Sequence, residues 1–267
     1  MTQTHYFKPN QALDHEIKTI EYTIAQHNFQ FITDRGVFSR NKVDYGTNIM
    51  LKTVITELKK SRFDFSYVAA QDESQNNMIE SINGIKIQKC LDLGCGYGVV
   101  SIVLNTLFPE QRWYAVDINP RAVELTKRNS KKHGLNITVI ESDGIPKSII
   151  SSSEIYKVSE FKMRTIESDG IPESMILGSE SDKKIKFDLV ILNPPIRAGK
   201  DVCYRLFTEV AAAIKTDSVF YTVIQKKQGA VSAFKYLQKL FSDVIVVDKS
   251  GGYHTIRCRI PSPIESD

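Results

Sequence analysis

Residues 91–98 read LDLGCGYG, directly after a short apolar run and directly before a stretch with helical spacing of apolar residues. Glycines let the backbone turn sharply and approach a ligand closely, and free amides at a helix start face that ligand. A dinucleotide-binding fingerprint places its third glycine three residues after the second. Here Val99 stands at that position and the third glycine is Gly98. The spacing therefore predicts a strand–loop–helix unit that binds something other than a diphosphate on the helix.

The same alternation continues along the chain. Six short apolar runs are separated by segments whose apolar residues recur at helical spacing: 90–93, 113–116, 137–140, 187–192, 219–224 and 244–247. Nearly continuous apolar strands between amphipathic helices are what a parallel sheet covered on both faces requires. We therefore expect a doubly wound, Rossmann-like α/β sheet.

The first part of the chain has a different pattern. Apolar and polar residues alternate over 20–24 and again over 29–31, which predicts a hairpin around the polar interval 26–28. A helical pattern follows at 48–58. We expect residues 1–85 to form a small hairpin-and-helix cap packed on the main domain, residues 86–260.

One segment of the chain is repeated. The heptapeptide IESDGIP occupies residues 140–146 and recurs unchanged at 166–172. Two units of this length cannot build a solenoid, so the repeat indicates a local tandem duplication. We expect an exposed insertion near 141–184, in which Asp143 and Asp169 have the same neighbours.

Composition narrows the class of protein. The chain has 267 residues, of which 42% are hydrophobic and 25% charged, as in a globular domain with a sizeable core. No apolar run approaches the roughly 20 residues that cross a bilayer, and the N-terminus lacks a secretory pattern, so we expect a cytoplasmic protein without a membrane partner. The four cysteines form no Cys-x-x-Cys pair and have no nearby histidines at ligand spacing, which predicts reduced thiols and no metal site.

The net charge of +4 is distributed unevenly. Residues 141–184 hold nine acidic and six basic residues, a balance of −3, so the other residues carry +7. A basic body with one acidic, serine-rich segment is compatible with binding a polyanion. Solvated surface charge alone produces the same pattern.

An acidic residue follows the second strand run. Asp117 lies 21 residues after Gly96, where a sheet of this kind presents a carboxylate to a ribose. Each hydrogen bond from a ribose hydroxyl to that carboxylate contributes roughly 1.5–3 kcal/mol. The alternative is a helix N-cap ahead of Pro120, and one residue can serve both roles. With the glycines, Asp117 indicates a nucleoside ligand.

The motif NPPI occupies residues 193–196, directly after the fourth strand run. Two prolines fix φ and cannot donate hydrogen bonds, so the carbonyls of Asn193 and Pro194 become fixed acceptors beside the Asn193 side-chain oxygen. Such an array suits a planar exocyclic amine, whose hydrogens it can accept. The alternative is a rigid exit from the strand.

Together these motifs resemble class I S-adenosylmethionine-dependent methyltransferases of the Asn-Pro-Pro group, which methylate amino nitrogens. The resemblance implies that S-adenosylmethionine is the cofactor and that its methionine moiety meets Asp92, Gly94, Gly96 and Gly98. It further implies that Asp117 binds the ribose hydroxyls and that Asp143 contacts the adenine amine. We prefer Asp143 to Asp169 because 137–140 is the better strand run.

The same resemblance implies that Asn193, Pro194 and Pro195 are the catalytic residues that hold the target nitrogen. Four further segments narrow the resemblance to the small-domain group that contains bacterial ribosomal small-subunit RNA guanine-N2 methyltransferases: 33–39, 43–47, 226–230 and 251–253. The implied substrate is an exocyclic amino group of RNA, with guanine N2 in small-subunit ribosomal RNA or particles as the first choice.

The chain departs from the pattern of this methyltransferase group in two ways, and both leave alternative substrates open. The best-known ribosomal members are longer, with a duplicated half that this chain lacks. Many amino-methyltransferases have an aromatic residue after Asn-Pro-Pro to stack on the base, where this chain has Ile196. The alternatives are a protein glutamine N-methyltransferase, which has Tyr at that position, and a non-catalytic RNA-binding protein that retains the fold. A nicotinamide dehydrogenase is disfavoured by Val99 and the Asn-Pro-Pro motif.

Overall fold

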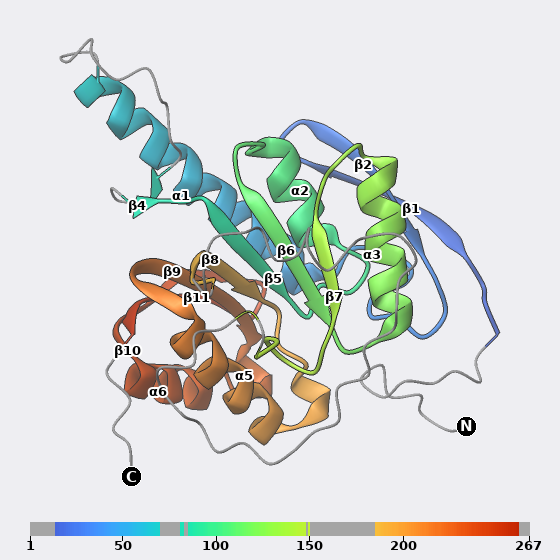
Figure 1. Ribbon diagram of the computed structural model, residues 1–267. Coiled ribbons are helices and arrows are strands. Elements are labelled where there is room, and N and C mark those ends of the chain that lie inside the picture. The colour runs from blue at the N-terminus through green and yellow to red at the C-terminus, as the bar shows by residue number, and fades with distance from the viewer. Residues whose placement is uncertain (1–13, 70–80, 83–84, 148, 150–184, 262–267) are drawn as a thin grey trace.

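The computed structural model describes residues 14–69, 81–82, 85–147, 149 and 185–261 (Figure 1). One central sheet contains β5 (Lys89–Leu93), β6 (Arg112–Asp117), β7 (Thr138–Glu141), β8 (Phe187–Leu192), β9 (Ile214–Gln225), β10 (Phe241–Ser250) and β11 (Tyr253–Pro261). The helices are α1 (Tyr45–Ala69), α2 (Val99–Leu107), α3 (Pro120–Lys132), α5 (Lys200–Ala213) and α6 (Ala230–Leu240), with short 3₁₀ turns η1 (Ile196–Ala198) and η2 (Lys226–Gln228). Two further pairs of strands are β1 (Lys18–Ile24) with β2 (His27–Thr33), and β3 (Ser81–Ile82) with β4 (Ile85–Lys86).

The strand order across the central sheet is β10-β11-β9-β8-β5-β6-β7. Strands β5 to β9 are parallel, whereas β11 is antiparallel to both of its neighbours. The prediction of a doubly wound α/β sheet is confirmed. The winding reverses at β5, which pairs with β6 on one side and β8 on the other. Sheets of this kind bind ligands at the carboxyl ends of the strands beside this reversal.

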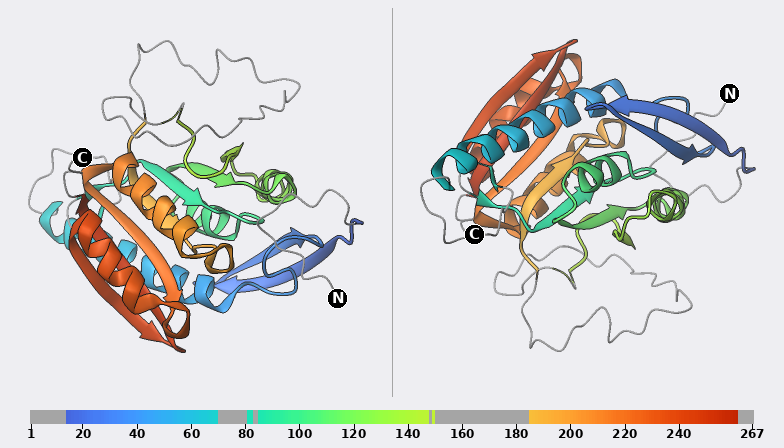
Figure 2. Two further views of the ribbon diagram at one scale, coloured as in Figure 1. Left: turned by 90° about the horizontal axis from the view of Figure 1, so that it is seen from below. Right: turned by 90° about the horizontal axis from the view of Figure 1, so that it is seen from above.

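Both faces of the sheet are covered by helices. Along β5, Cys90 belongs to the core that includes α1, α2 and α3, and Leu91 belongs to the core that includes α5 and α6. Figure 2 shows α1 on one side of the sheet and α5 and α6 on the other. Because alternate side chains of a strand enter opposite cores, a central strand is buried on both faces. All of β8 is buried, and its residues are apolar except Asp188, which forms an ion pair with Lys215.

The alternating pattern does not predict β11. A strand–helix alternation places each strand after a helix, but β11 follows β10 directly through Gly251 and Gly252, with φ of 54° and 79°. Its pairing with both β9 and β10 inserts it between two strands that precede it in the chain. Only the tertiary arrangement produces such an insertion.

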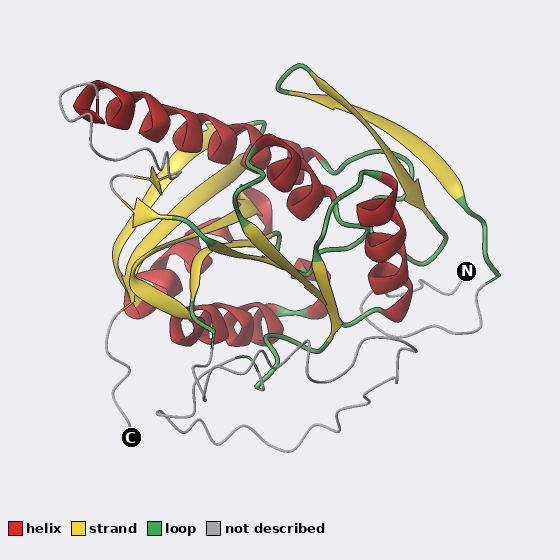
Figure 3. Ribbon diagram, turned by 45° about the horizontal axis from the view of Figure 1, so that its top comes forward, coloured by secondary structure: helices red, strands yellow, loops and turns green. Residues whose placement is uncertain are grey.

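The N-terminal hairpin is confirmed, with a shorter turn than the polar interval indicates. Ile24 pairs with His27, so the turn consists of Ala25 and Gln26, both with positive φ as a tight two-residue hairpin requires. Figure 3 shows this hairpin apart from the central sheet and beside α3. The buried Asn129 of α3 accepts a hydrogen bond from the backbone N–H of Ile32 at 2.7 Å and donates to the Ile32 and Tyr97 carbonyls at 2.9 Å. Asn129 therefore ties the hairpin to the glycine loop.

Three further features of the sequence can be examined in the described residues: the cysteines, possible membrane or metal sites, and the duplicated segment. All four cysteines are buried and none forms a disulfide. In the part of the chain that the structure describes, no helix combines the length and apolarity needed to cross a bilayer, and no three His, Cys, Asp or Glu residues are grouped as metal ligands. The first copy of the duplication, 140–146, begins within β7 and continues into the loop after it. The second copy, 166–172, lies outside the described residues.

Candidate active site

A cavity of about 690 Å³ opens at the carboxyl ends of β5, β6 and β8, beside the reversal of the sheet. Eight of the nine candidate residues line it: Asp92, Gly94, Gly96, Asp117, Asp143, Asn193, Pro194 and Pro195. The ninth, Gly98, does not. The fold thus brings together residues from four separate segments of the chain.

Gly98 has a structural position at the N-cap of α2. Its φ is 91°, and a Cβ at this residue would lie 3.0 Å from side-chain carbons of Ile102 and Thr126. Glycine is therefore required both for the backbone conformation and for the close packing of α2 against α3. Its contribution to the cavity is to set the direction in which the loop enters the helix.

The glycine loop is held against the end of β6. The backbone N–H groups of Gly94 and Cys95 donate to the Val116 carbonyl at 2.7 and 3.0 Å. The Gly96 N–H donates to Asp117 Oδ2 at 2.8 Å, and the Thr126 hydroxyl donates to the Gly96 carbonyl at 2.8 Å. These bonds place the two motifs side by side at one wall of the cavity.

Asp92 and Asp117 are acids at this wall. Burial raises the pKa of Asp92 to about 7, although the Ser101 N–H bonded to its carboxylate at 2.9 Å opposes that rise. Burial likewise raises the pKa of Asp117 to about 6. Neither carboxylate forms an ion pair with a Lys or Arg among the residues described. Two acids without a cationic partner suit a ligand that brings positive charge and hydroxyl donors.

Asp117 is not the N-cap of α3. That position belongs to Asn119, whose side chain accepts from the Arg121 N–H at 3.0 Å. Asp117 Oδ1 instead accepts from the Asn119 N–H at 2.9 Å. The Gly96, Ile118 and Asn119 N–H groups all bond the Asp117 carboxylate, whose two oxygens retain capacity for a further donor from the cavity.

Asp143 lines the cavity from the loop after β7. Its Oδ1 forms an ion pair of 2.5 Å with Arg205 of α5. Arg205 also pairs with Glu209 at 2.6 Å, and Glu209 accepts from the Ile145 N–H at 2.9 Å. This network fixes the loop that carries Asp143. Asp169, the equivalent residue of the second copy, lies outside the described residues.

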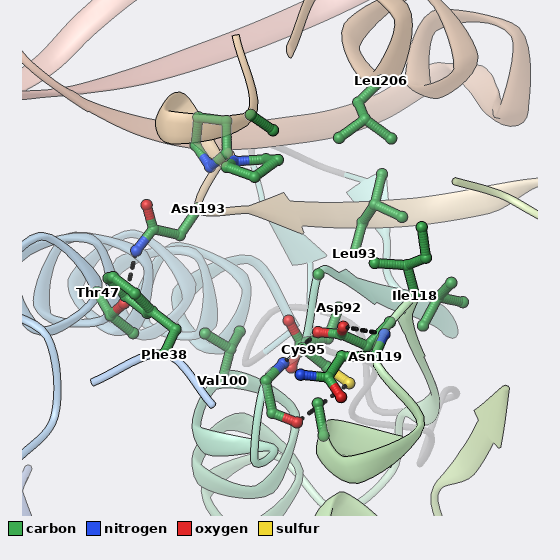
Figure 4. A pocket seen from close by; sticks show the side chains of 18 of the residues that line it. Phe38, Thr47, Asp92, Leu93, Cys95, Val100, Ile118, Asn119, Asn193 and Leu206 are labelled. Carbon is green, nitrogen blue, oxygen red and sulfur yellow. Dashed lines mark hydrogen bonds between the residues drawn. The ribbon is translucent and has the colours of Figure 1, made fainter. Parts of the chain in front are cut away.

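Asn193 follows β8 at the opposite wall. Its amide Nδ2 donates to Thr47 Oγ1 at 2.9 Å and to Asp44 Oδ2 at 3.1 Å. Figure 4 shows Nδ2 pointing at Thr47 and the amide oxygen pointing away from it. Both amide hydrogens therefore have partners, and Oδ1 is left as an acceptor.

The two prolines shape the turn that follows. Pro195 has φ −75° and ψ 71°, and the Ile196 N–H donates to the Pro194 carbonyl at 2.8 Å, which is an inverse γ-turn. The Pro194 carbonyl is thus fixed, as the prolines predict, but one of its lone pairs is already used. A carbonyl has a second lone pair, so Pro194 still has capacity to accept.

Several lining residues have no role assigned from the sequence. Phe38 and Asp44 come from the segment between β2 and α1, and Thr47 comes from the first turn of α1. Gln228 and Tyr253 come from η2 and the start of β11. The segments that contain them carry the family resemblance, but spacing along the chain does not show that they meet. The Lys226 N–H bonds the Gly252 carbonyl at 2.8 Å, which places η2 beside the β10–β11 turn.

The comparison with protein families agrees with this geometry. The model of the methyltransferase small domain matches residues 65–153 and 146–257, which is more than half of the chain. The chain belongs to the methyltransferase small domain family. The two matches overlap at 146–153, so the break between them falls beside the duplication. Methyltransferases of this family use S-adenosylmethionine, and the cofactor predicted from the motifs is confirmed.

Two similar proteins differ in how much of their own length this chain matches. YbxB of Bacillus subtilis (strain 168), an uncharacterized protein, is 29% identical over 256 residues, 96% of this chain and 98% of that protein. Ribosomal RNA small subunit methyltransferase C of Haemophilus influenzae (strain PittEE) is 24% identical over 247 residues, 92% of this chain and 56% of that enzyme. This member of the family therefore matches almost the whole length of YbxB, but little more than half the length of methyltransferase C.

A solved structure shows the same fold. The 16S rRNA N2 methyltransferase RsmC of T. thermophilus, in complex with AdoMet and guanosine, superposes with a TM-score of 0.62 at 17% identity. The match covers 91% of this chain and 50% of that chain. This member of the family thus has the architecture of one half of that enzyme.

Proposed function

We propose that this protein transfers a methyl group from S-adenosylmethionine to an exocyclic amino group of RNA, with guanine N2 of small-subunit ribosomal RNA as the substrate that the relatives favour. The observation that carries the proposal is the fixed Asn193 amide, whose oxygen has no hydrogen-bond donor among the described residues. It stands across the cavity from the glycine loop. An acceptor in that place suits an incoming N–H group.

The cofactor side of the cavity fits S-adenosylmethionine. We assign Asp92 to its amino group, Asp117 to its ribose hydroxyls and Asp143 to its adenine amine. S-adenosylmethionine supplies a methyl group on a positively charged sulfur, which keeps the electron pair of the carbon–sulfur bond when an amine attacks. The Asp92 and Asp117 carboxylates, which form no ion pair with a Lys or Arg among the described residues, stabilise a cationic ligand in this wall.

The residues of the Asn-Pro-Pro motif position the amine. Asn193 Oδ1 and the Pro194 carbonyl accept its hydrogens, which directs the nitrogen lone pair along the line of transfer. Holding two reactants in near-attack geometry is worth about 7–11 kcal/mol of barrier. One N–H proton leaves to solvent once the new carbon–nitrogen bond has formed.

The mouth of the cavity suits a nucleic acid. Exposed basic residues lie on the segments around it: Arg197, Lys200, Lys226 and Lys227. Positive side chains around a substrate site are the electrostatic footprint of a polyanion partner. The N-terminal region, residues 1–85, contributes Phe38, which is 44% exposed and lines the cavity. An aromatic ring there offers a stacking surface for a base, which favours RNA over a glutamine side chain.

The test is methylation of defined substrates with labelled S-adenosylmethionine. Small-subunit particles, naked small-subunit RNA and a glutamine-containing peptide are supplied separately, and the products are digested and identified by mass spectrometry. We expect N2-methylguanosine from the wild-type protein and from Asn28→Ala, an exposed control on the hairpin, and none from Asn193→Ala. Methylated glutamine would establish the alternative, and absence of any methylated product would overturn the proposal.

A further inference from the structure

We propose that Asp44 is a positioning residue for methyl transfer, which orients the Asn193 amide and strengthens its oxygen as an acceptor. The inference deepens the proposed function and rests on it. Asp44 stands at the start of α1, and 149 residues separate it from Asn193. Its carboxylate lines the same cavity.

The contacts form a closed network of three side chains. Asp44 Oδ2 accepts from the Thr47 hydroxyl at 3.3 Å and from Asn193 Nδ2 at 3.1 Å. Thr47 Oγ1 in turn accepts from Asn193 Nδ2 at 2.9 Å. Because the Thr47 hydrogen points at Asp44, its oxygen can only accept from Asn193. The network therefore accounts for both hydrogens of the amide.

This arrangement fixes which end of the amide faces the substrate. Rotation of the Asn193 amide by half a turn would place Oδ1 against the Asp44 carboxylate, which can only accept, and Thr47 could donate to Oδ1 only by giving up its own bond to Asp44. The rotated amide would lose its hydrogen bond to the carboxylate and gain an electrostatic repulsion. Asp44 and Thr47 thus keep Oδ1 available for the amine.

The charge of Asp44 has a second effect. A carboxylate that accepts from the NH₂ end of an amide polarises the group and increases the negative charge on its oxygen. A more negative Oδ1 accepts more strongly from an amine whose N–H groups become more acidic as the methyl transfers. An acceptor that is already oriented acts without reorganisation during the reaction.

The packing around Asp44 leaves little freedom. A Cβ on Gly46 would lie 3.1 Å from Asp44 Oδ2 and 2.9 Å from Tyr253 Cε1. Asp44 also accepts from the Thr47 N–H at 2.9 Å, so it is the N-cap of α1. A useful variant therefore has to keep the cap while it removes the contact to Asn193.

Two substitutions separate these roles. Serine and asparagine are both good N-caps, so Asp44→Ser and Asp44→Asn should leave the melting temperature close to that of the wild-type protein. Serine is too short to reach Asn193, whereas asparagine offers a neutral oxygen in place of the carboxylate. We expect the single-turnover methylation rate to fall about tenfold or more in Asp44→Ser and by a smaller factor in Asp44→Asn. The dissociation constant of S-adenosylmethionine should be unchanged in both.

A double-mutant cycle shows whether Asp44 acts through Asn193. In an Asn193→Ala background, Asp44→Ser should cause no further loss of rate, because the group that Asp44 orients is gone. An equal loss in both backgrounds, or a wild-type rate in Asp44→Ser, would overturn the inference. Thr56→Ala, on the exposed face of the same helix, is the matched control and should behave as wild type.

A second measurement needs no substrate. The side-chain NH₂ signals of Asn193 are assigned in a ¹⁵N-asparagine-labelled sample by their absence in Asn193→Ala. They should shift in Asp44→Ser and stay in place in Thr56→Ala. Unchanged signals would overturn the role of Asp44 whatever the substrate is, whereas a wild-type protein that methylates no RNA would overturn the proposed function alone.

Discussion

The backbone N–H of Gly96 donates to Asp117 Oδ2 at 2.8 Å, and this bond joins the glycine loop to the acid at the end of the next strand. The Asn119 N–H holds the other oxygen at 2.9 Å. The orientation of the carboxylate is therefore set before any ligand binds. A preoriented group loses less conformational entropy on binding, which makes Asp117 a strong candidate for the ribose contact.

Asp117→Ala should weaken S-adenosylmethionine binding by about tenfold or more, because one carboxylate is proposed to hold two hydroxyls. The dissociation constant is measured by calorimetry, and circular dichroism checks that the variant is folded. An unchanged constant in a folded variant would remove Asp117 from the site.

The affinity for S-adenosylmethionine should rise with pH through about 7, because the pKa of Asp92 is raised to about 7 by burial and a cationic ligand favours its ionised form. Binding near pH 6 should release protons, visible as heats that depend on the ionisation enthalpy of the buffer. Asp92→Asn should remove most of this pH dependence.

The free energy of unfolding of the free protein depends on pH in the opposite direction from the cofactor affinity. An unfolded aspartate titrates near pH ~3.9, so the folded state holds an extra proton between that pH and about 7. The contribution of Asp92 to stability is therefore fully present below about pH 4 and is lost as pH rises through about 7. Denaturant unfolding of the wild-type protein and of Asp92→Asn across this range measures the difference.

Asn193→Ala should lower single-turnover methyl transfer by about a hundredfold, near 2.7 kcal/mol, as for the loss of one preorganised group in an oxyanion site. Cofactor affinity should stay the same, because the contacts assigned to the cofactor lie at the carboxyl ends of β5 and β6 and in the loop after β7. Asn193→Asp keeps an acceptor and should retain partial activity. Full activity in Asn193→Ala would exclude the amine-holding mechanism, and lost cofactor binding would move Asn193 to the cofactor side.

Asp143→Ala should weaken cofactor binding, whereas Asp169→Ala should not, if the first copy supplies the adenine contact. Asp143 and Asp169 have identical neighbours in sequence. Any difference in cofactor affinity between the two variants therefore comes from the different places of these residues in the fold. Weakened binding in Asp169→Ala alone would reverse the assignment.

Deletion of residues 147–172 gives an independent test of the duplication. It fuses the copies and leaves one ESDGIP in place, with Met175 at the position of Ile149. We expect the shortened protein to fold and to bind S-adenosylmethionine with wild-type affinity. An unfolded product would show that the segment is part of the core.

Much of the fold follows from the sequence alone. Strands such as β8, whose residues are apolar except Asp188, are largely apolar because both faces of the sheet are covered, and that local pattern predicts a parallel α/β core without knowledge of the partners. The glycine loop, Asp117 and Asn193 are likewise recognisable, because each lies at the end of a strand run. The position of β11 cannot be predicted in this way, because β11 pairs with both β9 and β10, two strands that precede it in the chain.

The sequence by itself determined the elements of the sheet and the residue types at its carboxyl edge, because strand periodicity and strand-end motifs are local properties. Only the tertiary structure decided which way the Asn193 amide points, because its two acceptors, Asp44 and Thr47, lie at the start of a helix about 150 residues away along the chain. The orientation of a side chain depends on partners in space, and distances along the chain do not specify them.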